Sequence, residues 1–158
     1  MNNIINVALI GCGRVAGHHA RSIKDIPGLA RLVSVCDIVD ERRNELGEAH
    51  NVPTFSNYFE MLDKHPEIDV VSIITPSGMH YEHALDIISR YKKNIIVEKP
   101  TFMRPSQVRK VYSEAVATDT QVFAVFQNRH NLAIKRVLQG LRQGELGRLR
   151  SVGVRVRW

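Results

Sequence analysis

The sequence is poor in cysteine and in aromatic residues, and it contains no hydrophobic run long enough to cross a membrane. Two of the 158 residues are cysteine, and 6% are aromatic. Cys12 and Cys36 lack a C-x-x-C partner and a histidine at ligand spacing, so we predict buried, reduced thiols and no metal centre. The longest apolar runs have the length of strands, which predicts no membrane-spanning segment and no membrane partner.

A signal peptide is also absent from the sequence as printed. Met1-Asn2-Asn3 has neither the basic region nor the long apolar segment of such a peptide. Together with the cysteine usage, this predicts a cytoplasmic protein. The 44% hydrophobic and 24% charged residues are ordinary for a soluble globular protein, and the length is sufficient for about one domain with a sizeable core.

The net charge of +6 is distributed unevenly along the chain. Fourteen basic residues face fifteen acidic ones up to Asn128, whereas from Arg129 onward eight basic residues accompany Glu145 alone. A solvated basic face, an anionic ligand near the C-terminal segment and an acidic partner chain are all compatible with this excess. Basic and aromatic residues are not interleaved and no zinc-finger spacing occurs, so we predict no nucleic-acid partner.

A glycine turn follows the first apolar run, Ile4–Ile10, which is typical of a strand buried on both faces. The turn reads G-x-G-x-x-A, in which Gly11 permits the tight turn and Gly13 lets a pyrophosphate approach the backbone. Asp37 follows Gly13 by 24 residues, at the end of a second apolar run. A carboxylate at about this spacing binds the adenosine ribose in dinucleotide sites. Nucleotide binding is therefore a better interpretation than a purely structural turn.

Strand-like runs and helical periods alternate along most of the chain. Asp40 is expected to cap a polar helix that runs to about His50, and Ser56 to cap the next helix. Repeated strand–helix units of this size predict an α/β fold, a Rossmann-type doubly wound parallel sheet. Ligands of such sheets lie at the carboxyl ends of the strands. The residues expected there are Gly11–Ala16, Asp37-Ile38, Thr75–His80, Glu98–Pro100 and Gln127–Arg129.

Four segments give the sequence a family resemblance: GCGRVAGHH with Asp37, TPSGMHYEHA (Thr75–Ala84), EKPTF (Glu98–Phe102) and FQNRHN (Phe126–Asn131). With them, the chain resembles the Gfo/Idh/MocA oxidoreductases over nearly all of its length. Within that family, the first and last segments are most similar to dehydrogenases of UDP-N-acetylglucosamine-derived uronates, which oxidise the 3-hydroxyl of the sugar.

The resemblance implies a role for each candidate site residue. Lys99 would be the catalytic residue, contacting the nicotinamide ribose side and the substrate hydroxyl, where an ammonium group can polarise the reacting oxygen. Ser77 stands where the family often has asparagine. The implied cofactor-binding residues are Gly11, Cys12, Gly13, Arg14, Val15, Asp37, Thr75, Pro76, Ser77, His80, Glu98, Lys99, Gln127 and Arg129.

The residues around Asp37 favour NAD as the cofactor. A carboxylate at this position repels the 2′-phosphate of NADP, and the next residue, Ile38, is apolar. Arg42 and Arg43 follow closely enough to keep NADP open as the alternative.

The resemblance also implies a second, β-rich substrate domain, which would supply an Asp…His pair with the histidine as proton acceptor. We expect residues 1–128 to form the dinucleotide-binding domain. Residues 129–158 would form a connecting helix and the first strand of the second domain, because Val152, Val154, Val156 and Trp158 alternate with other residues. None of the seven histidines takes the place of the proton acceptor, so this chain alone is expected to bind cofactor without turnover.

Three functions follow as interpretations. The first is an NAD-dependent sugar dehydrogenase whose partner is a small-molecule sugar, in the narrower reading a nucleotide sugar. The second is a polyol or inositol dehydrogenase of the same family, and the third is a non-catalytic dinucleotide-binding module. In each case the one-sided strand Leu149–Trp158 is expected either to pair with its counterpart in another copy, which predicts a homo-oligomer, or to be disordered.

Overall fold

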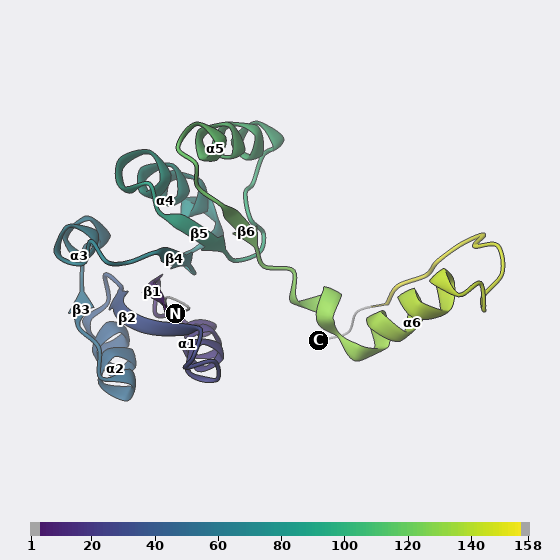
Figure 1. Cartoon of the computed structure of the whole chain (residues 1–158), viewed down its shortest axis with the longest axis horizontal. Coiled ribbons are helices and arrows are strands. Elements are labelled where there is room, and N and C mark those ends of the chain that lie inside the picture. Colours follow the sequence, from purple (N-terminus) through teal and green to yellow (C-terminus); the bar gives the residue numbers. More distant parts are fainter. Residues whose placement is uncertain (1–3, 156–158) are drawn as a thin grey trace. The chain divides into compact units, whose positions relative to one another are not determined.

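The computed structural model describes residues 4–155 of the chain. These residues belong to two compact units, Met1–Val125 and Phe126–Trp158 (Figure 1). The first unit contains the whole sheet, and the second is mainly one helix. The two units are therefore described separately.

The sheet of the first unit has six strands in the order β3-β2-β1-β4-β5-β6. All neighbouring pairs are parallel. This arrangement confirms the α/β, doubly wound fold expected from the alternation of strands and helices. The strands are β1 (Ile5–Ile10), β2 (Ala30–Cys36), β3 (Thr54–Phe55), β4 (Val70–Ile73), β5 (Asn94–Val97) and β6 (Val122–Ala124).

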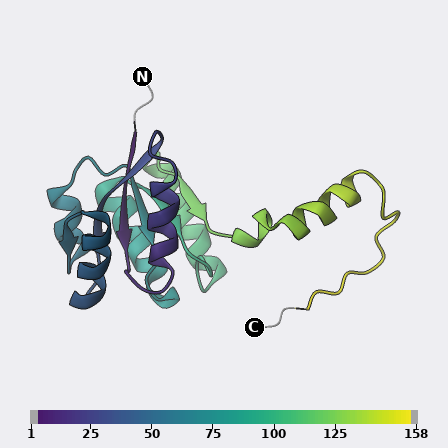
Figure 2. The same ribbon diagram turned by 90° about the horizontal axis from the view of Figure 1, so that it is seen from below.

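Helices cover both faces of this sheet (Figures 1 and 2). One face carries α1 and α2, and the other carries α3, α4 and α5. The sheet is consequently the middle of three layers, which explains the nearly continuous apolar runs in its central strands. The helices are α1 (Ala16–Lys24), α2 (Asp40–His50), α3 (Tyr58–Lys64), α4 (His80–Asp86), which continues as a π-helical turn (Ile87–Tyr91), and α5 (Pro105–Ala117).

Successive residues of β1 supply the two hydrophobic cores. Val7 and Leu9 pack on the face of α1 and α2, whereas Ala8 and Ile10 pack on the face of α3, α4 and α5. All four are buried. The period of two that strand geometry imposes thus fills both cores from one strand.

Two helices begin differently from the expectation. Asp40 is the first residue of α2, and the capping position before it is taken by Val39, whose side chain cannot form a capping hydrogen bond. The Val39 N–H donates to Asp37 Oδ1 at 2.8 Å. The cap of α3 is Asn57, whose Oδ1 accepts from the Phe59 N–H at 2.8 Å. The expected cap, Ser56, lies one residue earlier, whereas the helix begins at Tyr58 and Asn57 directly precedes it.

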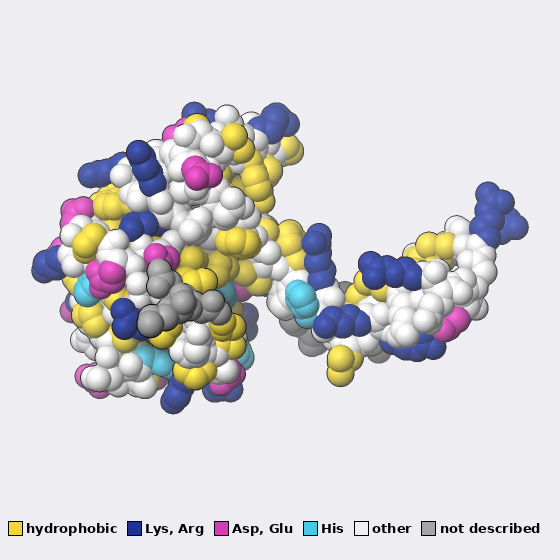
Figure 3. All heavy atoms as spheres, viewed as in Figure 1, with side chains coloured by type: hydrophobic (Ala, Val, Ile, Leu, Met, Phe, Trp, Pro, Cys, Tyr) yellow, Lys and Arg dark blue, Asp and Glu magenta, His cyan; other side chains and the backbone are white. Residues whose placement is uncertain are grey.

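The second unit contains a short 3₁₀ turn (Gln127–His130) and helix α6 (Leu132–Arg142). Asn131 caps α6, because its Oδ1 accepts from the Ala133 N–H at 2.9 Å. Two side chains on the apolar face of α6, Ile134 and Val137, are exposed. Figure 3 shows the dark-blue Lys and Arg side chains of this unit interspersed with yellow hydrophobic ones. No helix within residues 4–155 combines the length and apolarity needed to cross a membrane.

The predicted strand Leu149–Trp158 is not formed over its described part. Residues 149–155 adopt neither strand nor helix, and Val152 and Val154 are exposed. The expectation fails here because a strand exists only by hydrogen bonding to a neighbouring strand, and the described part of the second unit has none. Val156 and Trp158 lie outside the described residues.

Candidate cofactor site

Gly11 holds the loop after β1 against the loop after β4. Its φ is +95°, a conformation that other residues rarely adopt, and an added Cβ would stand 2.8 Å from the carbonyl carbon of Ile74 and from the nitrogen of Thr75. The Gly11 N–H also donates to the carbonyl oxygen of Cys36 at 2.8 Å. Three loops at the carboxyl end of the sheet therefore meet at this glycine.

Gly13 lies on open space instead. No atom comes within 4 Å of a Cβ built there. In the described residues, the N–H groups of Gly13, Arg14 and Val15 donate to no backbone carbonyl, and they directly precede α1. Bare backbone with unpaired N–H groups at a helix start is suited to an anion such as a pyrophosphate, so these residues fit the expected cofactor.

Asp37 joins the second strand to the glycine loop. Its Oδ2 accepts from the Cys12 N–H at 2.6 Å, and its Oδ1 accepts from the Val39 N–H at 2.8 Å. Each carboxylate oxygen retains a further lone pair, and the side chain is only partly buried. The carboxylate is thus oriented by the protein and can still accept hydrogen bonds from the two ribose hydroxyls of a dinucleotide.

A cleft of about 520 Å³ extends from Asp37 to the loop after β4. A volume of this size is typical of small-molecule sites. Its lining is mostly apolar with a few polar groups, as expected for an adenosine, and comprises Ile10, Gly11, Gly13, Cys36, Asp37, Ile38, Val39, Arg42, Ser56, Asn57, Tyr58, Phe59, Ile74, Thr75, Pro76, Met79 and His83.

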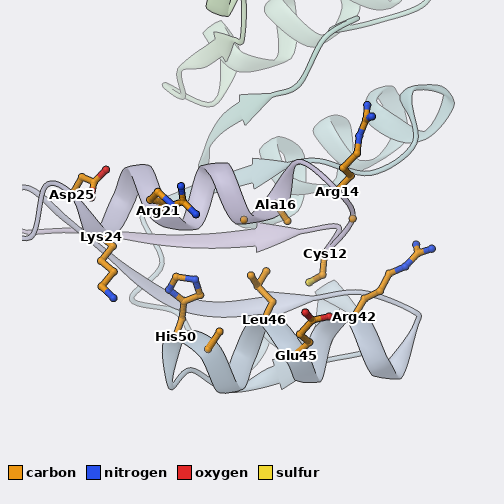
Figure 4. Close-up of a pocket in the computed structure, with 13 residues that line it drawn as sticks. Cys12, Arg14, Ala16, Arg21, Lys24, Asp25, Arg42, Glu45, Leu46 and His50 are labelled. Carbon is orange, nitrogen blue, oxygen red and sulfur yellow. The ribbon is translucent and has the colours of Figure 1, made fainter.

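The two arginines that kept NADP open have different positions. The Arg43 guanidinium is occupied, since its Nη1 donates to the backbone carbonyl of Asp37 and to the side chain of Asp40. Arg42 is exposed and lines the cleft. It also borders a second hollow, of about 890 Å³, between α1 and α2. Figure 4 shows Arg14 and Arg42 at the glycine-loop end of that hollow.

The two thiols face the protein interior at this site. Cys12 Sγ lies 3.7 Å from the carbonyl oxygen of Cys36, and both cysteines are free and buried. Burial, and secondarily the nearby charge of Asp37, raise the pKa of each thiol to about 12. Both thiols are therefore protonated near neutral pH. Within residues 4–155, no three His, Cys, Asp or Glu side chains converge as metal ligands would.

Two histidines of α4 pack under the loop after β4. His83 Nδ1 lies 3.0 Å from Thr75 Oγ1, and burial lowers the pKa of His83, which keeps its ring neutral. His80 is 1% exposed, with Nε2 at 2.8 Å from the Thr75 carbonyl oxygen and Nδ1 at 3.0 Å from that of Pro100. A neutral imidazole has one N–H and can donate to only one of them, whereas the protonated ring donates to both.

This geometry changes how His80 contributes to the candidate site. The family resemblance implies that His80 binds the cofactor, but both its ring nitrogens lie within 3.0 Å of backbone oxygens. It fastens the loop that contains Pro76 and Ser77 to the loop that contains Lys99. Contact between these loops and a cofactor stays a prediction.

Lys99 is exposed and directly follows β5, at the same sheet edge as the glycine loop. The Glu98 side chain before it points back into the protein: its Oε2 accepts from the Lys99 N–H at 2.9 Å, and its Oε1 lies 3.0 Å from His19 Nε2. The peptide bond after it, Lys99–Pro100, is cis. Lys99 thus presents an exposed side chain from a loop whose preceding residue, Glu98, is held by the protein.

Gln127 and Arg129 belong to the second unit. The Arg129 guanidinium lies over the Phe126 ring, 5.2 Å from its centroid. The contact of Gln127 and Arg129 with the cofactor, which the family resemblance implies, stays a prediction.

Sequence reasoning did not single out His19, Ser72 or His83 as members of the site. Two signals in the sequence indicate such roles. Ser72 is a hydroxyl residue inside the apolar run of β4, and His19 lies on the same helical face as Ala16 and Ile23. A polar side chain among buried positions requires a hydrogen-bond partner, so these two residues indicate a buried polar contact.

Comparison with known proteins agrees with this geometry. Residues 5–126 match a family model described as "Oxidoreductase family, NAD-binding Rossmann fold", that of Gfo/Idh/MocA. Myo-inositol 2-dehydrogenase of Thermotoga maritima is 24% identical over 91% of this chain, and D-glucoside 3-dehydrogenase of Escherichia coli is 27% identical over 92%. The chain covers 42% and 41% of these two proteins.

Among solved structures, the WlbA dehydrogenase from Bordetella pertussis, crystallised with NADH and UDP-GlcNAcA, is similar at a TM-score of 0.86 with 28% identity. The match covers 92% of this chain and 44% of that one. The chain thus spans less than half the length of the relatives that it matches. The matched family model extends over most of the chain and includes the glycine loop, Asp37 and Lys99. The chain therefore belongs to the Gfo/Idh/MocA oxidoreductase family and forms its NAD-binding Rossmann fold.

Proposed function

We propose that this chain is the cofactor-binding part of an NAD-dependent dehydrogenase that oxidises a sugar hydroxyl. The observation that carries the proposal is the common sheet edge of three features. These are the open glycine loop at Gly13, the oriented carboxylate of Asp37 and the exposed amine of Lys99. The first two suit a dinucleotide, and the third is a polar group beyond the strand expected near its reactive end.

Hydride transfer from an alcohol requires a hydride acceptor, which the nicotinamide ring of NAD supplies when it is bound. The hydroxyl must also lose a proton to a base. The Lys99 ammonium can donate a hydrogen bond to the hydroxyl oxygen, hold the carbinol hydrogen toward the cofactor and stabilise the charge that develops on oxygen. The proton acceptor would lie in a separate substrate domain, so Lys99 alone does not complete the reaction.

For the substrate, we propose a UDP-N-acetylglucosamine-derived uronate oxidised at its 3-hydroxyl. The support is the similarity to the Bordetella pertussis dehydrogenase bound to UDP-GlcNAcA, at 28% identity. The basic excess from Arg129 onward is compatible with an anionic substrate. The second candidate is a polyol or inositol substrate, which the similarity to myo-inositol 2-dehydrogenase supports.

The test is a substrate panel with the longest form of the protein that its gene encodes. NADH formation would be followed with UDP-GlcNAcA, myo-inositol, scyllo-inositol and simple glucosides at equal concentrations. A kcat/KM at least 100-fold higher for UDP-GlcNAcA supports the nucleotide-sugar proposal. Preference for an inositol would replace it with the second candidate, and no turnover with any alcohol would favour a non-catalytic binding module.

A further inference from the structure

A chain of hydrogen bonds crosses the face of the sheet beneath Lys99. Ser72 of β4 places its Oγ 3.0 Å from Nδ1 of His19 on α1, and His19 Nε2 lies 3.0 Å from Glu98 Oε1 after β5. The His19 and Glu98 side chains are 15% and 12% exposed, and Ser72 is 1% exposed. The chain thus joins three segments that are distant in sequence and largely excluded from water.

The donors and acceptors of this chain fit one arrangement well. The Glu98 carboxylate only accepts, so His19 Nε2 must carry a hydrogen and donate to it. In the neutral ring, Nδ1 then accepts, and the Ser72 hydroxyl is the donor that it needs. Glu98 therefore selects the ring tautomer whose N–H points at it, and Ser72 stabilises that tautomer by donating to Nδ1.

Glu98 links the His19 ring to the backbone of Lys99. Its second oxygen, Oε2, accepts from the Lys99 N–H at 2.9 Å, and its own N–H donates to the carbonyl oxygen of Ile73 at 3.0 Å. On the far side of Lys99, His80 Nδ1 lies 3.0 Å from the Pro100 carbonyl oxygen. Glu98 accordingly holds the backbone of Lys99 directly, while the Lys99 side chain is exposed.

We propose that His19 and Ser72 are positioning residues for Lys99 that act through Glu98. This inference rests on the proposed function, since it assumes that Lys99 orients the substrate hydroxyl. It also assigns Glu98 a role beyond the expected contact with the cofactor, because each of its carboxylate oxygens already contacts the protein. The energetic reason is that a buried, charge-assisted chain holds a loop more firmly than exposed contacts would.

The direct test is nuclear magnetic resonance on the 158-residue chain, which needs no substrate. Long-range ¹H–¹⁵N spectra give the tautomer of each histidine ring, and amide exchange rates report how firmly the Lys99 N–H is held. His19→Ala is expected to accelerate exchange at Lys99 at least 10-fold. The matched control is His18→Ala, which removes the exposed neighbouring ring of the same helix and should leave that rate unchanged.

Two further variants keep the test decisive if His19→Ala does not fold. Ser72→Ala retains the ring and should increase the population of the other tautomer, with faster exchange at Lys99. His19→Gln retains a donor toward Glu98 and should restore most of the protection. An unchanged Lys99 exchange rate in a folded Ser72→Ala variant with altered tautomer would overturn the inference.

Activity distinguishes this inference from the proposed function. In the longest form of the protein, His19→Ala should lower kcat about 10- to 100-fold, because a small misplacement of a reacting group costs this much. The KM for NAD should change less than threefold. A wild-type protein without dehydrogenase activity would refute the proposed function, while the exchange data would still decide whether the chain holds the loop. A wild-type protein that turns over and an equally active His19→Ala variant would refute only the positioning role.

Discussion

The backbone N–H of Cys12 donates to Asp37 Oδ2, with 2.6 Å between nitrogen and oxygen. The acidic residue expected to bind the ribose is therefore hydrogen-bonded to the glycine loop. The same side chain also accepts from Val39. Ribose recognition and loop geometry consequently depend on one residue. Substitution of Asp37 should affect both.

We expect the chain to bind NADH more tightly than NADPH, because Asp37 would repel the 2′-phosphate while Arg43 is occupied by its own neighbours. Asp37→Ala should weaken NADH binding about 10- to 100-fold, since hydrogen bonds to a charged group contribute about 1.5–3 kcal/mol. The substitution should also narrow the difference between the affinities for NADH and NADPH. Calorimetric titration of both measures this, with the exposed Glu41→Ala as control. Tighter NADPH binding by the wild type would contradict the prediction.

The two glycines of the loop should separate folding from binding. Gly11→Ala places a methyl group 2.8 Å from backbone atoms in a left-handed conformation, so the free energy of unfolding should fall by about 2 kcal/mol or more. Gly13→Ala meets no protein atom and should leave stability within about 1 kcal/mol. Its methyl group would instead occupy the position expected for the pyrophosphate and weaken NADH binding at least 10-fold. Urea unfolding and titration of both variants test the contrast, and normal NADH affinity in Gly13→Ala would place the pyrophosphate elsewhere.

Much of this arrangement was predictable from the sequence, because the doubly wound parallel sheet and the roles of Gly11 and Asp37 follow from local patterns and one spacing rule. The contacts of His80 and His19 were not, since each depends on backbone groups that come close only in the folded sheet. The same limit applies to the strand predicted at residues 149–158. Its alternation indicated the type of structure, but pairing depends on a second strand that the pattern does not contain.

The 158-residue chain should bind NAD without oxidising UDP-GlcNAcA, because the family resemblance implies that the proton acceptor belongs to a separate substrate domain. General-base catalysis contributes roughly 10²- to 10⁴-fold, and loss of substrate positioning costs more. Measurable steady-state NADH formation by the purified chain would disprove this. In the longest form of the protein, Lys99→Met should lower kcat about 100-fold or more, whereas the surface control Lys110→Met should not.

The thiols should make the protein less stable at high pH. The pKa of both Cys12 and Cys36 rises from an ordinary 9.0 to about 12 in the folded state. The folded protein therefore keeps protons that the unfolded chain releases, and the resulting stability, complete below pH 9, is lost progressively as the pH rises toward 12. Urea midpoints between pH 8 and 11 should fall less steeply in Cys12→Ala/Cys36→Ala. Rapid labelling of the native thiols by iodoacetamide at pH 7.5 would contradict their burial.

The second unit should promote association between copies of the chain. Ile134 and Val137 of α6 are exposed apolar residues, and burying such side chains releases about 25 cal/mol per Å². Basic residues surround them, so added salt should strengthen association by screening repulsion. Light scattering across protein and salt concentration tests this. Val137→Asp should shift the chain to monomer more than Gln139→Asp, which adds the same charge to an exposed position of the same helix.

The register of β1 has a consequence for synthesis of the protein on the ribosome. Val7 pairs with Val70 of β4, and Gly11 lies against Ile74. On this side, β1 can therefore form its hydrogen bonds only after a segment more than sixty residues downstream has been synthesised. Until β4 leaves the exit tunnel, β1 can pair only with β2, and one of its hydrogen-bonding edges is open to other nascent chains. The glycine loop is thus translated well before the strand and loop against which it packs in the folded sheet.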